Sequence, residues 1–207
     1  MKTVWLILSV SFPLLFSSCD SEDTSSPKSD GLIPLEVGGI WSYQVQQPFG
    51  IASDTVSAVT KIGGVFYYQV KGDLLGRMTG EGEWLRNSGD NVLVFDVALG
   101  EEDTLFAQGV AVGETWSAFT KWCVYRCDND SLIVTPAGEF QDVPCFELPC
   151  VPIPDNGTIC FVAPHLGIAR LIRVSIAGAI TYELTNYSAP NRSFNSLLRP
   201  VSHGGWE

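Results

Sequence analysis

The sequence predicts an all-β fold, built as a single antiparallel curved sheet that is half-barrel or barrel-like and has few helices. Apolar and polar residues alternate in several segments, which is the two-residue period of a strand with one buried face. Short runs rich in Gly, Asp and Asn separate these segments and are typical of tight turns. Strands that recur roughly every ten residues with such turns between them are typical of sandwiches, barrels and half-barrels.

Alternation defines the predicted strands in order along the chain. Residues 41–46 and 66–71 each place apolar side chains on one face and largely polar ones on the other. Residues 91–98 are apolar on both faces, which is typical of a strand covered on both sides. Residues 168–176 and 180–186 alternate on either side of an Ala-Gly pair, which predicts a hairpin.

The breaks between these runs have the chemistry of turns. Gly-Gly at 63–64 and the Asn- or Asp-containing runs at 88–91, 127–131 and 155–158 tolerate positive φ or hydrogen-bond their own backbone. Thr-Pro-Ala-Gly at 135–138 fits a type I turn with Pro at its second position. These breaks predict hairpin connections between neighbouring strands.

Residues 1–18 have the pattern of a secretory signal. Lys2 precedes an apolar run from Val4 to Phe16 that is short for a membrane span. Cys19 follows two serines and resembles the lipobox Cys of bacterial lipoproteins, which is acylated and becomes the mature N-terminus. An ordinary signal with an incidental Cys is the alternative, but Cys19 occupies the one position that the motif requires.

Residues 19–31 predict an acidic flexible tether, because a segment with so little apolar surface cannot offset the entropy of ordering it. Acyl chains on Cys19, palmitate among them, provide the expected membrane anchor, since each buried methylene contributes about 0.8 kcal/mol. Acidic residues after the Cys resemble sorting signals for the inner membrane in enteric bacteria and for the cell surface in Bacteroidetes-type organisms. The expected location is the bacterial cell envelope, with the outer membrane or cell surface favoured over the inner membrane.

Residues 32–187 form the predicted all-β domain, and residues 188–207 a poorly ordered C-terminal tail. The chain has 12 basic and 23 acidic residues and a formal net charge of −11, and loss of Lys2 with the signal makes it one unit more negative. Nucleic acids and anionic lipid surfaces require basic patches, so this charge argues against both as partners.

One short phrase occurs twice in the predicted domain. Gly38 and Trp41 in "VGGIWS" recur as Gly113 and Trp116 in "VGETWS". We interpret each copy as the start of a strand, because Gly permits a tight reversal and Trp buries a large apolar area. This interpretation predicts two glycines in tight turns and two largely buried tryptophans. Two exposed tryptophans lining one groove would instead indicate a binding site.

Four phrases resemble the recurring motifs of secreted bacterial lipoproteins that are in part described as TapB-like. The phrases are "LIPLEVGGIWSYQV", "VAVGETWS", "VTPAGEFQDVPCFEL" and "FVAPHLGIARL", and they span residues 32–186. The group's pattern is F-P-L-x-x-G-x-x-W-x-Y, then T-P-A-G-x-F, then a-P-G-x-G, and His165 stands where the group has Gly. The resemblance implies an all-β curved sheet, comparable to the half-barrels of periplasmic lipoprotein carriers, and it implies no catalytic residues.

Five cysteines follow the lipobox, and disulfides are the default expectation in an exported protein. Cys150 and Cys160 flank a predicted hairpin loop and form the first predicted pair. Cys127 and Cys145 form the second, if the Thr-Pro-Ala-Gly turn joins neighbouring strands. The odd number leaves at least one thiol unpaired or paired between chains. A metal site is the alternative, but the spacing lacks a Cys-x2-Cys pair and no His lies near in sequence.

The sequence offers little from which to build an enzyme. It lacks a Gly-x-Ser-x-Gly elbow, a phosphate-binding loop and a His-x-x-x-His pair. Its two histidines, His165 and His203, lie in a predicted turn and in the tail. The acidic run 101–103 predicts a solvated loop rather than paired catalytic carboxylates. We therefore expect a non-enzymatic protein with no cofactor and no metal.

The expected function is that of a lipid-anchored envelope protein that binds an apolar ligand or an envelope partner through its curved sheet. One alternative is a structural or interaction lipoprotein with a filled core and no ligand. A hydrolase is a further alternative and would need a clustered acid–base pair. The first two differ in whether the concave face of the sheet is a cavity.

Overall fold

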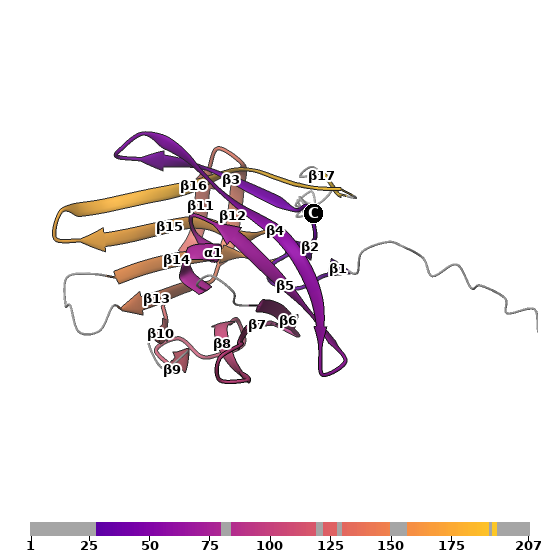
Figure 1. Cartoon of the computed structure of the whole chain (residues 1–207). Helices are drawn as coiled ribbons and strands as arrows, with labels where there is room; N and C mark the ends of the chain where they lie inside the picture. The colour runs from indigo at the N-terminus through magenta and orange to yellow at the C-terminus, as the bar shows by residue number, and fades with distance from the viewer. Residues whose placement is uncertain are drawn as a thin grey trace, which may run out of the picture.

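Strands dominate the protein and confirm the predicted all-β fold. The computed structural model describes residues 28–79, 84–118, 122–127, 130–149, 157–190 and 192–193. Within these residues, 13 strands form one antiparallel sheet that curls into a barrel-like wall (Figure 1). The described part of the chain contains a single helix, α1 (Leu75–Thr79). None of its helical structure has the length and apolarity needed to cross a lipid bilayer.

The large sheet runs through the chain out of sequence order. From one edge to the other its strands are β8 (Glu101–Ala107), β7 (Asn91–Asp96), β6 (Trp84–Ser88), β5 (Val65–Gly72), β4 (Gly50–Ile62), β3 (Ile40–Gln46), β16 (Gly178–Ala189), β15 (Gly167–Ser175), β14 (Gly157–Ala163), β13 (Cys145–Pro149), β10 (Trp122–Arg126) and β9 (Thr115–Ala118). The short β17 (Arg192–Ser193) pairs with β16. Two small sheets pair β1 (Lys28–Ser29) with β2 (Leu35–Glu36), and β11 (Asp130–Thr135) with β12 (Gly138–Val143).

Several predicted strands coincide with observed ones. Residues 41–46 lie in β3, 66–71 lie in β5, and 168–176 and 180–186 form the β15–β16 hairpin. The Thr-Pro-Ala-Gly segment turns between β11 and β12. Strand β1 lies within the segment predicted as a tether, and β17 lies within the segment predicted as a tail. The predicted signal peptide and Cys19 lie outside the described residues.

Aromatic side chains fill the interior of the sheet. Inward-facing positions of the strands supply them, as the alternation of buried and exposed residues in β3 requires. The bulkiest of the fully buried side chains are those of Trp41, Tyr43, Tyr68, Tyr187, Phe106 and Phe146. Rings of this size each bury a large apolar area, so the core supplies most of the stability of the sheet.

A buried carboxylate attaches α1 to the sheet. Asp54 faces inward from β4, is fully buried, and accepts the backbone N–H groups of Leu74 (3.1 Å), Leu75 (2.8 Å) and Gly76 (3.4 Å). Burial raises the pKa of Asp54, and the three N–H donors oppose that shift. Gly72, with φ of 151°, lies opposite Asp54, where an added Cβ would overlap the carboxylate. This close approach excludes any larger residue there.

The β11–β12 hairpin packs against β14, β15 and β16. The Ala137 N–H donates to the Leu184 carbonyl at 3.0 Å. Arg170 donates to the Val134 carbonyl at 2.7 Å and pairs with the largely buried Glu183 at 2.8 Å. These contacts fix the hairpin to the sheet through both backbone and side chains.

Candidate functional site

The two copies of the repeated phrase make the same turn and equivalent backbone hydrogen bonds. Gly38 and Gly113 both lie in turns, with φ of 87° and 90°. Three backbone hydrogen bonds of each copy match one for one. In the first copy they are Gly38 N–H to Val56 O (2.9 Å), Val56 N–H to Gly39 O (2.9 Å) and Gly39 N–H to Glu36 O (2.8 Å). In the second they are Gly113 N–H to Arg126 O (2.8 Å), Arg126 N–H to Glu114 O (2.9 Å) and Glu114 N–H to Ala111 O (3.1 Å).

The tryptophans of the two copies also make equivalent bonds. The Trp41 indole N–H donates to the Leu166 carbonyl at 2.7 Å, and the Trp116 indole N–H donates to the Thr104 carbonyl at 2.8 Å. Trp41 is 1% exposed, as the sequence predicts. Trp116 is half-buried and therefore more exposed than the prediction of a largely buried side chain.

Position in the sheet explains this difference. Strand β3, which carries Trp41, has β4 on one side and β16 on the other. Strand β9, which carries Trp116, pairs with β10 and is the last strand of the sheet. Trp116 therefore faces the line where β9 and the opposite end strand, β8, approach each other. We call this line the seam.

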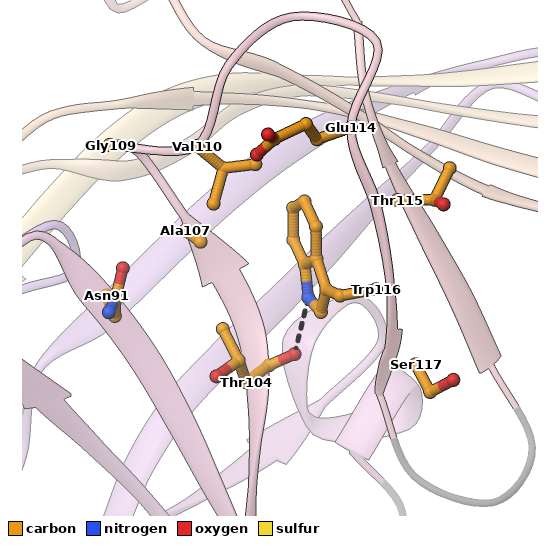
Figure 2. Close-up of a pocket in the computed structure, with 9 residues that line it drawn as sticks. All are labelled: Asn91, Thr104, Ala107, Gly109, Val110, Glu114, Thr115, Trp116 and Ser117. Carbon is orange, nitrogen blue, oxygen red and sulfur yellow. Dashed lines mark hydrogen bonds between the residues drawn. The ribbon is translucent and has the colours of Figure 1, made fainter.

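The seam closes without a backbone ladder between its two edges. Strands β8 and β9 lie side by side, at the bottom of the view in Figure 1, but neither is hydrogen-bonded to the other as a strand. The bond from the Trp116 indole to the Thr104 carbonyl crosses the seam (Figure 2). A side chain of β9 that is bonded to a backbone carbonyl of β8 thus bridges the two edges.

A pocket of about 630 Å³ opens at the seam, a volume within the usual range of small binding sites, about 300–1,000 Å³. Strand β8, strand β9, the segment between them and Asn91 of β7 supply its walls (Figure 2). The described residues that line it are Asn91, Thr104, Ala107, Gly109, Val110, Glu114, Thr115, Trp116 and Ser117. Among these, Glu114 is the one ionisable side chain. Hydroxyl, amide and small apolar groups make up most of the rest, which differs from the aliphatic lining expected of a cavity for acyl chains.

The β9 edge directs backbone hydrogen-bonding groups into the seam. The Arg126 N–H donates to the Glu114 carbonyl, and hydrogen-bonded pairs alternate along an antiparallel ladder. With the register of β9 and β10, this alternation assigns Trp116 to the ladder and leaves the N–H and C=O groups of Thr115 and Ser117 pointing away from β10. Among the described residues no strand pairs with this edge of β9, so the seam presents a sheet edge.

The acidic run 101–103 belongs to the other wall of the seam. The prediction of a loop there is wrong, because these residues begin strand β8 and pair with β7, although Glu101 and Glu102 are exposed to solvent as predicted. Glu102 accepts hydrogen bonds from Arg86 and from the Tyr67 hydroxyl. The Arg86 guanidinium holds the pKa of the Glu102 carboxyl below its usual range. An ion pair within the sheet, and not a loop, explains this acidic residue.

The structure describes both cysteines of one predicted pair and one cysteine of the other. Cys127 and Cys145 are direct cross-strand neighbours, because the Cys127 N–H donates to the Cys145 carbonyl at 3.0 Å next to the β10–β13 ladder. Cys160 is fully buried, lies opposite Phe146, and has its thiol 3.9 Å from the Met78 sulfur. Cys150 lies outside the described residues, so its pairing with Cys160 stays a prediction. The three described thiols of this set are not oxidised to disulfides.

The remaining candidate residues do not form a reactive cluster with the seam. His165 is exposed in the turn between β14 and β15, and His203 lies outside the described residues. In the part of the chain that the structure describes, no group of three His, Cys, Asp or Glu side chains is placed to hold a metal ion. Sequence reasoning missed Asn91, Thr104 and Ser117 as lining residues, although the repeat pointed to their neighbour Trp116.

Comparison with known proteins identifies no family. No protein-family model matches the chain, and no curated protein matches its sequence. A crystal structure described as a candidate lipoprotein from Parabacteroides distasonis ATCC 8503 is 9% identical, with a TM-score of 0.44 over 78% of this chain and 100% of that chain. A crystal structure described as a candidate exported protein with a YmcC-like fold from Bacteroides fragilis NCTC 9343 is 10% identical, with a TM-score of 0.45 over 76% and 98%.

Proposed function

We propose that this protein is a lipid-anchored, non-catalytic component of the bacterial envelope that binds an extended peptide segment of a partner protein at the seam. The signal pattern and the lipobox position of Cys19 support the anchor and the location. The position of the pocket between two end strands of one sheet carries the proposal for binding. The partner segment adds a strand to β9.

Strand addition uses hydrogen bonds that a sheet edge already offers. The backbone groups of Thr115 and Ser117 supply them on the β9 side. Because no backbone pairing joins β8 to β9 among the described residues, the two strands can part without breaking any rung of the sheet. The mixed polar and apolar lining suits the alternating side chains of a peptide strand.

An apolar ligand held inside the curved sheet is the second candidate. The fully buried aromatic side chains that fill the interior favour a partner protein over such a ligand. The pocket's hydroxyl and amide groups favour the same choice, since an acyl chain leaves them without hydrogen bonds.

A proline substitution tests strand addition by removing one backbone N–H group from the β9 edge. Ser117→Pro removes an N–H that faces the seam and leaves the β9–β10 ladder intact, whereas Ser117→Ala keeps that N–H. A photo-crosslinking amino acid in place of Val110 reports contact in cells that produce the full lipidated chain. We expect a discrete protein adduct in the wild-type and Ser117→Ala backgrounds and its loss with Ser117→Pro, with the Tm of all three within a few degrees.

Two results would contradict the proposed function. One is an adduct of equal yield in all three backgrounds, and the other is no adduct in the wild type. Native mass spectrometry of the same preparations adds a separate measurement. A lipid that leaves the protein only on unfolding, without any protein adduct, would favour the apolar ligand.

A further inference from the structure

In the described part of the chain, the first copy of the repeat has a strand neighbour, β16, for which the second copy has no counterpart. Strand β16 lies against β3, with Ser188 opposite Ile40 and Asn186 opposite Ser42. The positions equivalent to Ile40 and Ser42 in the second copy are those of Thr115 and Ser117, whose backbone groups face the pocket. The pocket thus lies where a counterpart of β16 would pair with β9.

An aromatic pair marks the centre of the β16–β3 contact. Tyr187 lies directly opposite Trp41, and their ring centroids are 5.1 Å apart with an interplanar angle of 38°. Both rings are fully buried, so this contact contributes area burial as well as ring–ring attraction. The Trp41 indole extends to a carbonyl at the start of β15, the strand beyond β16.

The second copy has the tryptophan of this arrangement. Among the described residues, no strand places an aromatic side chain opposite it as β16 does for Trp41. Trp116 lines the pocket, and its ring meets that of Phe146 edge-on, with centroids 6.2 Å apart. Its indole extends to the Thr104 carbonyl of β8, across the seam. The order β9, seam, β8 therefore repeats the order β3, β16, β15 with the middle strand absent.

One residue differs between the copies at the point where the tyrosine hydroxyl lies. A Cβ added to Gly39 would lie 3.2 Å from the Tyr187 hydroxyl. The second copy has Glu114 at the equivalent position, and its side chain lines the pocket. A tyrosine seated on Trp116 in the manner of Tyr187 would have its hydroxyl beside the Glu114 side chain, and a small shift of either group would let the carboxylate accept a hydrogen bond from it.

We propose that the segment bound at the seam presents a tyrosine to Trp116, flanked by small polar residues opposite Thr115 and Ser117, and runs antiparallel to β9. This inference rests on the proposed function and specifies the partner's chemistry. The chain's own β16 supplies a model of such a segment, with Asn186 and Ser188 on either side of Tyr187.

A synthetic peptide with the sequence LTNYSAP, that of residues 184–190, is the probe. Fluorescence anisotropy with the purified full chain in detergent measures its affinity. We expect saturable binding that weakens roughly tenfold or more when the tyrosine of the peptide becomes alanine. A phenylalanine there should weaken binding less, by about threefold, since it keeps the ring contact and loses the bond to Glu114.

Protein variants locate the binding. Ser117→Pro should abolish it and Ser117→Ala should retain it, because only the first removes the edge N–H. Glu114→Gln should reduce the ratio between the affinities of the tyrosine and phenylalanine peptides. Trp116→Ala should abolish binding of both. The alanine and phenylalanine peptides test the proposal on the unaltered protein, so it remains testable if Trp116→Ala does not fold.

Equal affinity of the tyrosine and alanine peptides, or undiminished binding to Ser117→Pro, would overturn the inference. The crosslink at Val110 separates this failure from failure of the proposed function. If the wild-type adduct forms in cells and disappears with Ser117→Pro while LTNYSAP does not bind, the tyrosine pattern is wrong and strand addition stands. If the adduct is absent as well, both are wrong.

Discussion

At the scale of single residues, His165 holds a backbone conformation that side chains with a Cβ disfavour. Its φ is 64°, in the left-handed region, where the clash of Cβ with the backbone costs about 1–2 kcal/mol. The side chain is exposed in the turn that precedes β15. The backbone here takes a conformation that suits Gly.

His165→Gly should therefore raise the free energy of unfolding by about 1 kcal/mol, since Gly relieves the clash but gains freedom in the unfolded chain. In thermal unfolding followed by circular dichroism, this corresponds to a Tm rise of about 2–4 °C. His165→Ala keeps the Cβ and serves as the control, with no comparable gain. A lower Tm for His165→Gly than for the wild type would show that the imidazole stabilises the turn.

At the scale of elements, the β9–β10 hairpin is attached to the sheet through a short ladder. Only Tyr125–Glu147 and Arg126–Phe146 pair β10 with β13 among the described residues. Cys127 and Cys145 follow directly in the same register, with a backbone hydrogen bond of 3.0 Å between them. Burial and contact with the Cys127 thiol raise the pKa of the Cys145 thiol, so the half-exposed Cys127 is the better nucleophile of the two.

We expect Cys127 and Cys145 to form a disulfide when an oxidising protein or small-molecule disulfide reaches Cys127. The Cys127 thiolate attacks that reagent, Cys145 then displaces it, and two thiols of reduced reagent are released. A bridge that closes a loop of this length stabilises a protein by about 3 kcal/mol. The Cys127→Ser variant should lose that increment in denaturant unfolding, whereas Cys150→Ser should not lose this bridge.

Peptide mapping of protein isolated without reductant checks the linkage directly. A fragment joining Cys127 to Cys145 is the expected product. Complete alkylation of both thiols in that protein would exclude the bridge, and linkage of Cys127 to any other cysteine would assign the pairing differently.

At the scale of the whole molecule, the expected anchor is independent of the fold. Palmitate labelling in a bacterium that produces the full chain should give a labelled band, and Cys19→Ala should remove the label. Cys127→Ser, which leaves the lipobox unchanged, is the matched control and should keep it. Undiminished label in Cys19→Ala would refute acylation at this position.

The alternation of apolar and polar residues was enough to predict the fold class and several strands. It failed for segments whose structure depends on pairing with residues far away in the sequence. The alternation in 41–46 and 66–71 depends on one buried face, which is visible in sequence. Strand β4 escaped prediction because its inward face includes the charged Asp54, whose partners in α1 lie twenty residues further on. The run 101–103 was misjudged because acidic residues seldom begin a strand, and here Arg86 on β6 offsets the charge.

The candidate site was only half visible in the sequence for the same reason. The repeat singled out Trp116, but no local signal shows that β9 ends the sheet or that Thr104 lies across the seam from it. Which strand is last in a sheet depends on the whole order of pairing. A sequence read segment by segment does not contain that order.

The indole closure of the seam also has a mechanical consequence. Most neighbouring strands of the wall are joined by rows of backbone hydrogen bonds that share a load, although β5 and β6 have one pairing and β10 and β13 have two among the described residues. Between β8 and β9 the described residues make no such pairing, so the load there falls on side-chain contacts that include the bond from Trp116 to Thr104. A pull across the barrel would therefore separate the wall first at the seam, while the strands on either side kept their register.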